Sequence, residues 1–138
     1  MLVPDTLLQQ RYQVVRLIGQ GGMGAVYEAL DQRLGITVAL KQTLASSGQA
    51  GRAFEREARL LAGLRHPSLP KVIDHFVDDS GRFLVMEFIP GEDLGTVLER
   101  REAPFPVADV LRWGDQLLGV LESLHSREPP ILHRDIKP

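Results

Sequence analysis

Short stretches of alternating apolar and polar residues dominate the first half of the chain and predict strands. They fall at residues 12–18, 25–30, 36–42, 72–77 and 82–89. Turn-forming residues separate neighbouring stretches at 31–35 and 78–81. Between the third and fourth strands, apolar residues recur at helical spacing, which predicts a helix that begins near Gly51 and stops before Pro67. Five strands and one helix would form a compact lobe.

The pattern changes to a helical period after Pro90-Gly91. A short helix is expected around 93–101 and a long one from about 107 to 125. The apolar residues of the long helix form one stripe: Val107, Val110, Leu111, Leu117, Leu118, Leu121 and Leu124. Such a stripe needs a partner. The chain thus divides into an N-terminal extension at 1–10, a strand-rich lobe at 11–89 and the start of a helical region at 90–138, an α+β organisation.

Composition limits the functional classes. The sequence has 138 residues, of which 43 % are hydrophobic and 25 % charged, as in one ordinary soluble domain. Its net charge is −2, so no global field attracts nucleic acid or an anionic membrane surface. The absence of cysteine excludes disulfides, thiolate metal sites and a cysteine nucleophile, and it favours a cytoplasmic location. The N-terminus lacks a signal-peptide layout, and no apolar run reaches the roughly 18 residues of a membrane-spanning helix.

Four glycines within six positions stand between two apolar runs: Gly19, Gly21, Gly22 and Gly24. A Walker phosphate loop would need lysine and serine or threonine after the last glycine, but Ala25 and Val26 follow it. A Rossmann fingerprint would need a long helix next and a carboxylate about 20 positions further on, and residues 39–44 contain none. The remaining pattern, G-x-G-x-x-G-x-V between two strands, indicates a phosphate-covering loop or a glycine-rich hairpin turn without a ligand.

The third predicted strand and the helix after it contribute one charged residue each. Alternation puts Ala39 and Lys41 on one face of the strand. An isolated lysine at a strand end is usually a solvated charge, but behind a glycine loop it can pair with phosphate oxygens. On the helix, Glu57 lies on the apolar face, whereas Glu55 lies beside arginines. Glu57 is thus either the partner of Lys41 or a helix-edge residue that solvent reaches.

Four motifs, in their order along the chain, resemble those of the Hanks-type serine/threonine protein kinases in their bacterial form. They are the glycine loop at 19–26, Val38-Ala-Leu-Lys41 in place of V-A-I-K, Glu57 as the helix-C glutamate, and the catalytic-loop sequence His133-Arg-Asp-Ile-Lys-Pro138. The resemblance covers about residues 10 to 138. It implies a kinase small lobe, with a five-stranded antiparallel sheet and helix C, followed by the hinge and the first helices of an incomplete helical large lobe.

The resemblance implies transfer of the ATP γ-phosphate to a protein serine or threonine with the help of Mg²⁺. Glycine-loop amides would cover the phosphates, and Lys41 would pair with the α and β phosphates while Glu57 holds it. Asp135 would orient the protein hydroxyl and accept its proton. Lys137, which is typical of serine/threonine rather than tyrosine kinases, would neutralise charge on the transferred group.

The same resemblance places the adenine ring in the strand-rich lobe. Ile18, Val26 and Ala39 would enclose the ring, with Met86 as the gatekeeper at the back of the pocket. Taken alone, Met86 can also be a simple core residue.

The segment after the last strand would read the adenine edge and the ribose. Residues 87–89, including Glu87 and Ile89, resemble the hinge, whose backbone groups face the adenine edge. Asp93 lies where the family often contacts ribose, although Glu92 competes for that role. Without the resemblance, Asp93 can equally be a helix cap.

Several parts of the family pattern are absent from these 138 residues. They lack the catalytic-loop asparagine, the D-F-G aspartate, the activation segment and the A-P-E motif. The metal ligands would therefore lie beyond this chain, which we expect to be an incomplete, inactive portion of a kinase. Two alternatives remain: a nucleotide-binding or regulatory module that acts through protein contacts, and an interaction fragment that binds no nucleotide.

Overall fold

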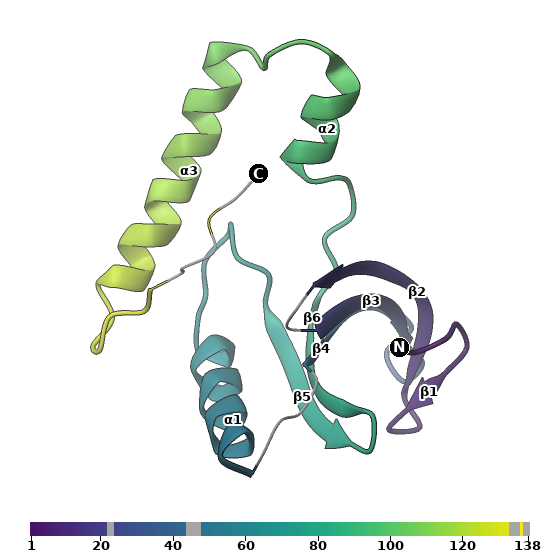
Figure 1. The fold of residues 1–138 in the computed structure, drawn as a ribbon. Helices are drawn as coiled ribbons and strands as arrows, with labels where there is room; N and C mark the ends of the chain where they lie inside the picture. The colour runs from purple at the N-terminus through teal and green to yellow at the C-terminus, as the bar shows by residue number, and fades with distance from the viewer. Residues whose placement is uncertain (22–23, 44–47, 133–135, 137–138) are drawn as a thin grey trace. The chain divides into compact units, whose positions relative to one another are not determined.

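A computed structural model describes residues 1–21, 24–43, 48–132 and 136. They separate into two compact units, one of residues 1–65 with 70–89 and the other of residues 66–69 with 90–138 (Figure 1). No helix among the described residues combines the length and the apolar character that crossing a bilayer requires.

The first unit is built around one six-stranded antiparallel sheet, which curls strongly in Figure 1. The strands run in the order β1-β2-β3-β4-β6-β5. Their bounds are β1 Leu7–Leu8, β2 Tyr12–Gly21, β3 Gly24–Asp31, β4 Ile36–Thr43, β5 Val72–Asp78 and β6 Gly81–Glu87. The helix α1, Gly48–Ala62, packs beside β5. The α+β fold expected from the sequence, an antiparallel sheet with one helix followed by further helices, is therefore confirmed.

The strand β1 was not predicted. It consists of Leu7 and Leu8 alone, which pair with Gln13 and Tyr12 of β2. A segment of two apolar residues is too short to show an alternation pattern, so the sequence-based prediction assigns it to an N-terminal extension. The pairing instead buries Leu8 at the edge of the core, which gives the N-terminal segment a place in the sheet.

The two faces of the sheet differ in character. Residues paired across neighbouring antiparallel strands share a face. Tyr27, Leu40 and Val85 form one such row, and all three are fully buried. Adjacent rows alternate, so Val26, Lys41 and Leu84 lie in register on the opposite face. The core thus occupies one face of the sheet, and the other carries the lysine.

Aromatic rings fill the core between β2, β5 and β6. Tyr12 stacks on Phe76 with ring centroids 5.7 Å apart, and Phe76 stacks on Phe83 at 4.8 Å. The Tyr12 hydroxyl donates a hydrogen bond to Asp74 at 2.9 Å. Burial, together with this bond to a carboxylate, raises the pKa of Tyr12. The hydroxyl therefore stays protonated and fixes the end of the stack.

Asp31 organises the turn between β3 and β4. Its fully buried carboxylate accepts hydrogen bonds from the Arg11 guanidinium at 2.7 to 3.0 Å. It also accepts from the backbone N–H groups of Arg33 and Leu34, at 3.0 and 3.2 Å. The Arg11 bond is the main reason that the pKa of Asp31 is lowered. One carboxylate thereby ties the start of β2 to the end of β3.

The second unit contains the helices α2, Leu94–Arg101, and α3, Val107–His125. Phe105, before α3, packs edge-on against Trp113, with centroids 5.0 Å apart. Helix α2 has no buried residue, and α3 buries Val120 and Leu124. Much of the predicted apolar stripe on α3 is exposed, namely Val107, Val110, Leu111, Leu117 and Leu118.

Candidate functional site

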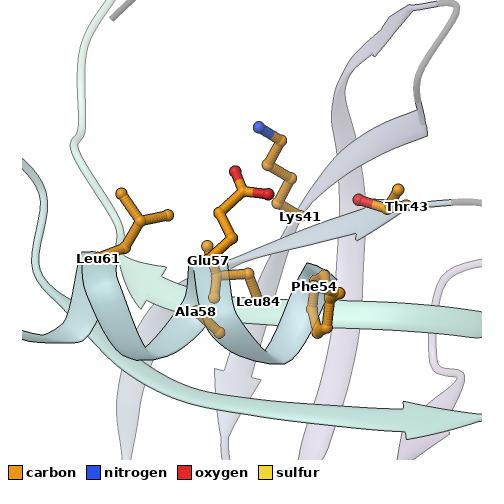
Figure 2. Close-up of a pocket in the computed structure, with 7 residues that line it drawn as sticks. All are labelled: Lys41, Thr43, Phe54, Glu57, Ala58, Leu61 and Leu84. Carbon is orange, nitrogen blue, oxygen red and sulfur yellow. The ribbon is translucent and has the colours of Figure 1, made fainter. Parts of the chain in front are cut away.

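Lys41 and Glu57 meet on the face of the sheet opposite the core. Lys41 lies on β4 and Glu57 on α1, and both line one hollow of about 40 Å³. The other residues around the hollow are Thr43, Phe54, Ala58, Leu61 and Leu84. Figure 2 shows the ammonium and the carboxylate on the same side of this group. The two charges predicted to be partners are thus brought into one place.

Local sequence patterns explain both positions. Val38 and Leu40 point into the core and are fully buried, so Lys41 emerges on the other face of β4. On α1, Ala58 is buried, and Glu57 lies on the same side of the helix as the other apolar residues that line the hollow. Glu57 nevertheless stays exposed. It is therefore both near Lys41 and open to solvent.

Lys41 and Glu57 do not form a direct salt bridge. The ion pairs among the described residues join other groups, and none of 4.0 Å or less links these two side chains. A hollow of about 40 Å³ has room for little more than one water molecule. It is far smaller than the roughly 300–1,000 Å³ of a typical ligand pocket. The hollow itself is therefore too small for a ligand, which would have to bind beside it.

The glycines next to this face are of two kinds. A Cβ built on Gly19 or Gly21 would meet nothing within 4 Å, so their backbone borders open space. Gly24 has a φ of +147°, and a Cβ there would lie 1.9 Å from the carbonyl oxygen of Gln42. Gly24 is therefore required by the pairing of β3 with β4, whereas Gly19 and Gly21 leave backbone that a ligand can approach. Gly22 lies outside the described residues.

Three of the apolar residues predicted around adenine share the lysine face of the sheet. Val26 is half-buried and lies opposite Lys41, while Ala39 is buried and lies opposite Met86. Met86 is half-buried, which suits a core residue as well as a pocket wall. Ile18 lies at an irregularity in the pairing of β2 with β3 and is 45 % exposed.

The predicted hinge begins at the end of β6. The backbone N–H of Glu87 donates to the Lys71 carbonyl at 2.8 Å, and the Glu87 carboxylate accepts from the Lys71 N–H at 3.3 Å. The strand stops at Glu87, two residues earlier than predicted, and Ile89 follows it with a 60 % exposed side chain. The segment before Pro90 is thus outside the sheet.

Asp93 and Glu92 already have partners within the second unit. Asp93 is the N-cap of α2 and accepts from the backbone N–H and from the hydroxyl of Thr96, both at 2.8 Å. These bonds lower the pKa of Asp93. Glu92 pairs with Arg100 at 2.6 Å. The helix-cap interpretation of Asp93 is confirmed, and contact with ribose stays a prediction.

Sequence reasoning did not single out Thr43 and Leu84, which also line the hollow. Both could have been found, because Thr43 follows Lys41 at the two-residue period of a strand and Leu84 pairs with Lys41 across β4 and β6. Asp135 and Lys137, the predicted catalytic residues, lie outside the described residues.

The arrangement suits an anionic ligand with an apolar part. An ammonium group, open glycine backbone and a nearby carboxylate that can orient the ammonium are what phosphate oxygens require. Val26 and Ala39 offer an apolar surface on the same face. The residues present therefore fit a nucleotide. Among the described residues, no group of three or more His, Cys, Asp or Glu is arranged to hold a metal ion.

Comparison with known proteins identifies the family. The protein kinase domain profile matches residues 12–138. The chain is 41 % identical to serine/threonine-protein kinase pkn2 of Myxococcus xanthus. The aligned region covers all of this chain and 17 % of that protein. It is 35 % identical to the probable serine/threonine-protein kinase YbdM of Bacillus subtilis, over 95 % of the chain and 52 % of that protein.

A solved structure agrees with these relatives. The kinase domain of PknI from Mycobacterium tuberculosis superposes with a TM-score of 0.82 and 30 % identity, over all of this chain and 55 % of that one. The chain thus spans about half the length of the solved kinase domain and at most about half of the two curated relatives. It belongs to the protein kinase domain family, among the Hanks-type serine/threonine kinases of bacteria.

Proposed function

We propose that the protein transfers the γ-phosphate of ATP to serine or threonine residues of proteins, and that this chain supplies the nucleotide-binding part. The observation that carries the proposal is the meeting of Lys41 and Glu57 in one hollow, on the sheet face that also presents Val26 and Ala39. When bound, ATP supplies the phosphoryl group and Mg²⁺ offsets its charge.

Different residues would bind different parts of ATP. Lys41 attracts phosphate oxygens, and Glu57 restrains the lysine by its opposite charge. The open backbone at Gly19 and Gly21, with Gly22 beside them in the sequence, lets amides approach the phosphates. Apolar residues receive the adenine ring and exclude water from it, namely Ile18, Val26, Ala39 and Met86. Glu87, Ile89 and Asp93 would face the adenine edge and the ribose.

Catalysis would depend on the last residues of the chain. Asp135 orients the substrate hydroxyl and takes its proton, and Lys137 offsets negative charge on the group in transfer. The substrates are proteins rather than nucleic acids, in keeping with the net charge of −2, and the lack of cysteine favours the cytoplasm. Residues 11–89 form the small lobe with the hinge, β1 joins the N-terminal segment 1–10 to the sheet of this lobe, and residues 90–138 form the start of the large lobe.

On its own, the 138-residue chain should bind nucleotide without transferring phosphate. It contains no asparagine and no D-F-G sequence, the elements that hold the metal ions in this family. A second candidate function is a regulatory module that acts by binding another protein. It is favoured by the exposed stripe on α3, where Val107 is 73 % and Leu111 68 % exposed.

Nucleotide titration of the purified chain tests the proposal. ATP should bind saturably, with little dependence on Mg²⁺, and Lys41→Ala should weaken binding by about tenfold because a charged hydrogen-bonding partner is lost. Arg33→Ala is the matched control, since it removes one positive charge from an exposed site elsewhere. Binding that is absent, or equally strong in Lys41→Ala and Arg33→Ala, would contradict the assignment.

A further inference from the structure

We propose that Gln42 is a positioning residue for Lys41 and the glycine segment, and that a network of buried hydrogen bonds holds Gln42 in place. Gln42 directly follows Lys41 on β4, but it lies on the core face, opposite Phe83, and is only 4 % exposed. A buried amide is costly unless its polar atoms have partners. The proposal rests on the proposed function, because the groups that Gln42 positions are those assigned to the phosphates of ATP.

The amide of Gln42 has a partner at each end. Its Oε1 accepts a hydrogen bond from the Tyr27 hydroxyl at 3.2 Å, and its Nε2 donates to the Ser80 carbonyl at 2.7 Å. The oxygen of the fully buried Tyr27 also accepts from the backbone N–H of Leu2 at 3.1 Å. Because that N–H already uses the oxygen as an acceptor, the hydroxyl proton is directed at Gln42. The network thus joins the N-terminal segment, β3, β4 and the turn before β6.

Gln42 also contacts the neighbours of β4 on both sides. A Cβ on Gly24 would lie 1.9 Å from the Gln42 carbonyl oxygen, so the end of the glycine segment rests directly on this peptide group. On the other side, a Cβ on Gly81 would lie 3.7 Å from the Nε2 of Gln42. The position of Gln42 therefore determines how β4 lies between β3 and β6.

A displacement of Gln42 would move the groups proposed to bind phosphate. Lys41 shares a peptide bond with Gln42, and Gly24 packs against the next carbonyl. Hydrogen bonds are directional, whereas an apolar side chain of similar size would fill the space without fixing β4 along β3. A misplacement of about 1 Å in a positioned group can slow a reaction about a hundredfold. The hydrogen bonds of Gln42 thus set the distance between the lysine and the glycine backbone.

ATP titration and urea denaturation of three variants of the 138-residue chain test this role. Tyr27→Phe and Gln42→Leu should each weaken ATP binding about five- to tenfold, because each breaks the network that positions Lys41. Each should also lower stability, because it leaves the other partner unpaired. The double variant Tyr27→Phe/Gln42→Leu removes both partners and should recover most of the lost stability. Its ATP binding should stay as weak as in the single variants, because the network stays broken.

Tyr12→Phe is the matched control. Tyr12 is also a buried tyrosine of this core, and its hydroxyl donates a hydrogen bond to Asp74. The variant should lower stability but leave ATP binding within about twofold of wild type. In a Lys41→Ala background, Tyr27→Phe should weaken ATP binding no further, because its effect acts through the lysine. Equal effects of Tyr12→Phe and Tyr27→Phe on ATP binding, or recovery of ATP binding together with stability in the double variant, would overturn the proposal.

Hydrogen exchange tests the positioning without nucleotide. In the double variant, the amides of Lys41 and Thr43 should exchange at least about tenfold faster than in wild type, while those of β5 change little. Unchanged exchange at Lys41 and Thr43 would overturn the role of Gln42 even if the chain bound no ATP. Wild type that fails to bind ATP, or binds it equally well as Lys41→Ala, would instead contradict the proposed function.

Discussion

Individual glycines in the 19–24 segment have separate physical roles. Gly24 is fixed by its positive φ and by the Gln42 carbonyl, which a Cβ would approach to 1.9 Å. That oxygen belongs to the backbone and cannot move aside without disturbing β4. Gly21, by contrast, borders open space. The same residue type therefore serves strand pairing at one position and access to the backbone at another.

Two alanine substitutions should distinguish these roles. Gly24→Ala should lower the free energy of unfolding by more than about 2 kcal/mol, because it adds both backbone strain and a clash. Gly21→Ala should change stability by less than about 0.5 kcal/mol but weaken ATP binding several-fold, since its methyl group would occupy the approach to the backbone. Urea denaturation and ATP titration measure the two effects. Similar stability losses in both variants would contradict this separation.

The candidate site shows which features residue patterns predict and which they do not. The period-two alternation of β4 and the helical periodicity of α1 were sufficient to predict that Lys41 and Glu57 lie near each other. The patterns did not show that the two side chains would meet without a salt bridge, because that depends on how closely α1 approaches the sheet. Asp93 illustrates the same limit. A carboxylate directly before a helix can be an N-cap or a ligand contact, and the sequence pattern does not distinguish the two roles.

Secondary structure elements were predicted well except at their ends. Helix α1 begins at Gly48 and ends at Ala62, where Gly63 donates back to the carbonyls of Arg59 and Leu60. A glycine at this position ends helices readily, whereas the sequence-based prediction relies on Pro67. The strand β1 was not predicted because it is defined by its pairing with β2 and not by a pattern within its own two residues. Element ends thus follow from particular hydrogen bonds rather than from periodicity.

The turn between β3 and β4 depends on one buried carboxylate. Asp31→Asn should lower the free energy of unfolding by about 2 kcal/mol or more, because the charged bonds to Arg11 are lost while the site stays buried. Asp79→Asn, at the exposed turn between β5 and β6, should change it little. Urea denaturation of both variants measures the difference.

The cost of Asp31→Asn should depend on pH in a defined direction. The folded pKa of Asp31 is lowered, so its charge stabilises the fold fully above the ordinary carboxyl pKa of about 3.9 and loses this effect as pH falls through the folded pKa. The gap between wild type and Asp31→Asn should therefore be constant near neutrality and shrink in acid. A gap that widens in acid would contradict the assignment.

Buried residues are distributed unevenly over the whole molecule. The aromatic and aliphatic core lies in the first unit, around Tyr27, Leu40 and Phe83, which are fully buried. The helix α2 has no buried residue, and α3 has two. Local stability follows the burial of apolar groups, so the two units should not resist opening equally.

Hydrogen exchange of the backbone amides measures this difference. Amides of β4 should exchange only through global unfolding of the first unit, with rates that fall steeply as stability rises. Amides of α2 should exchange at least about a hundredfold faster and with little dependence on urea, because small local openings expose them. Gly24→Ala provides an internal check, since it should accelerate exchange in β4 and leave α2 unchanged. Equal protection of β4 and α2 in wild type, falling together in Gly24→Ala, would instead show that the two units unfold as one.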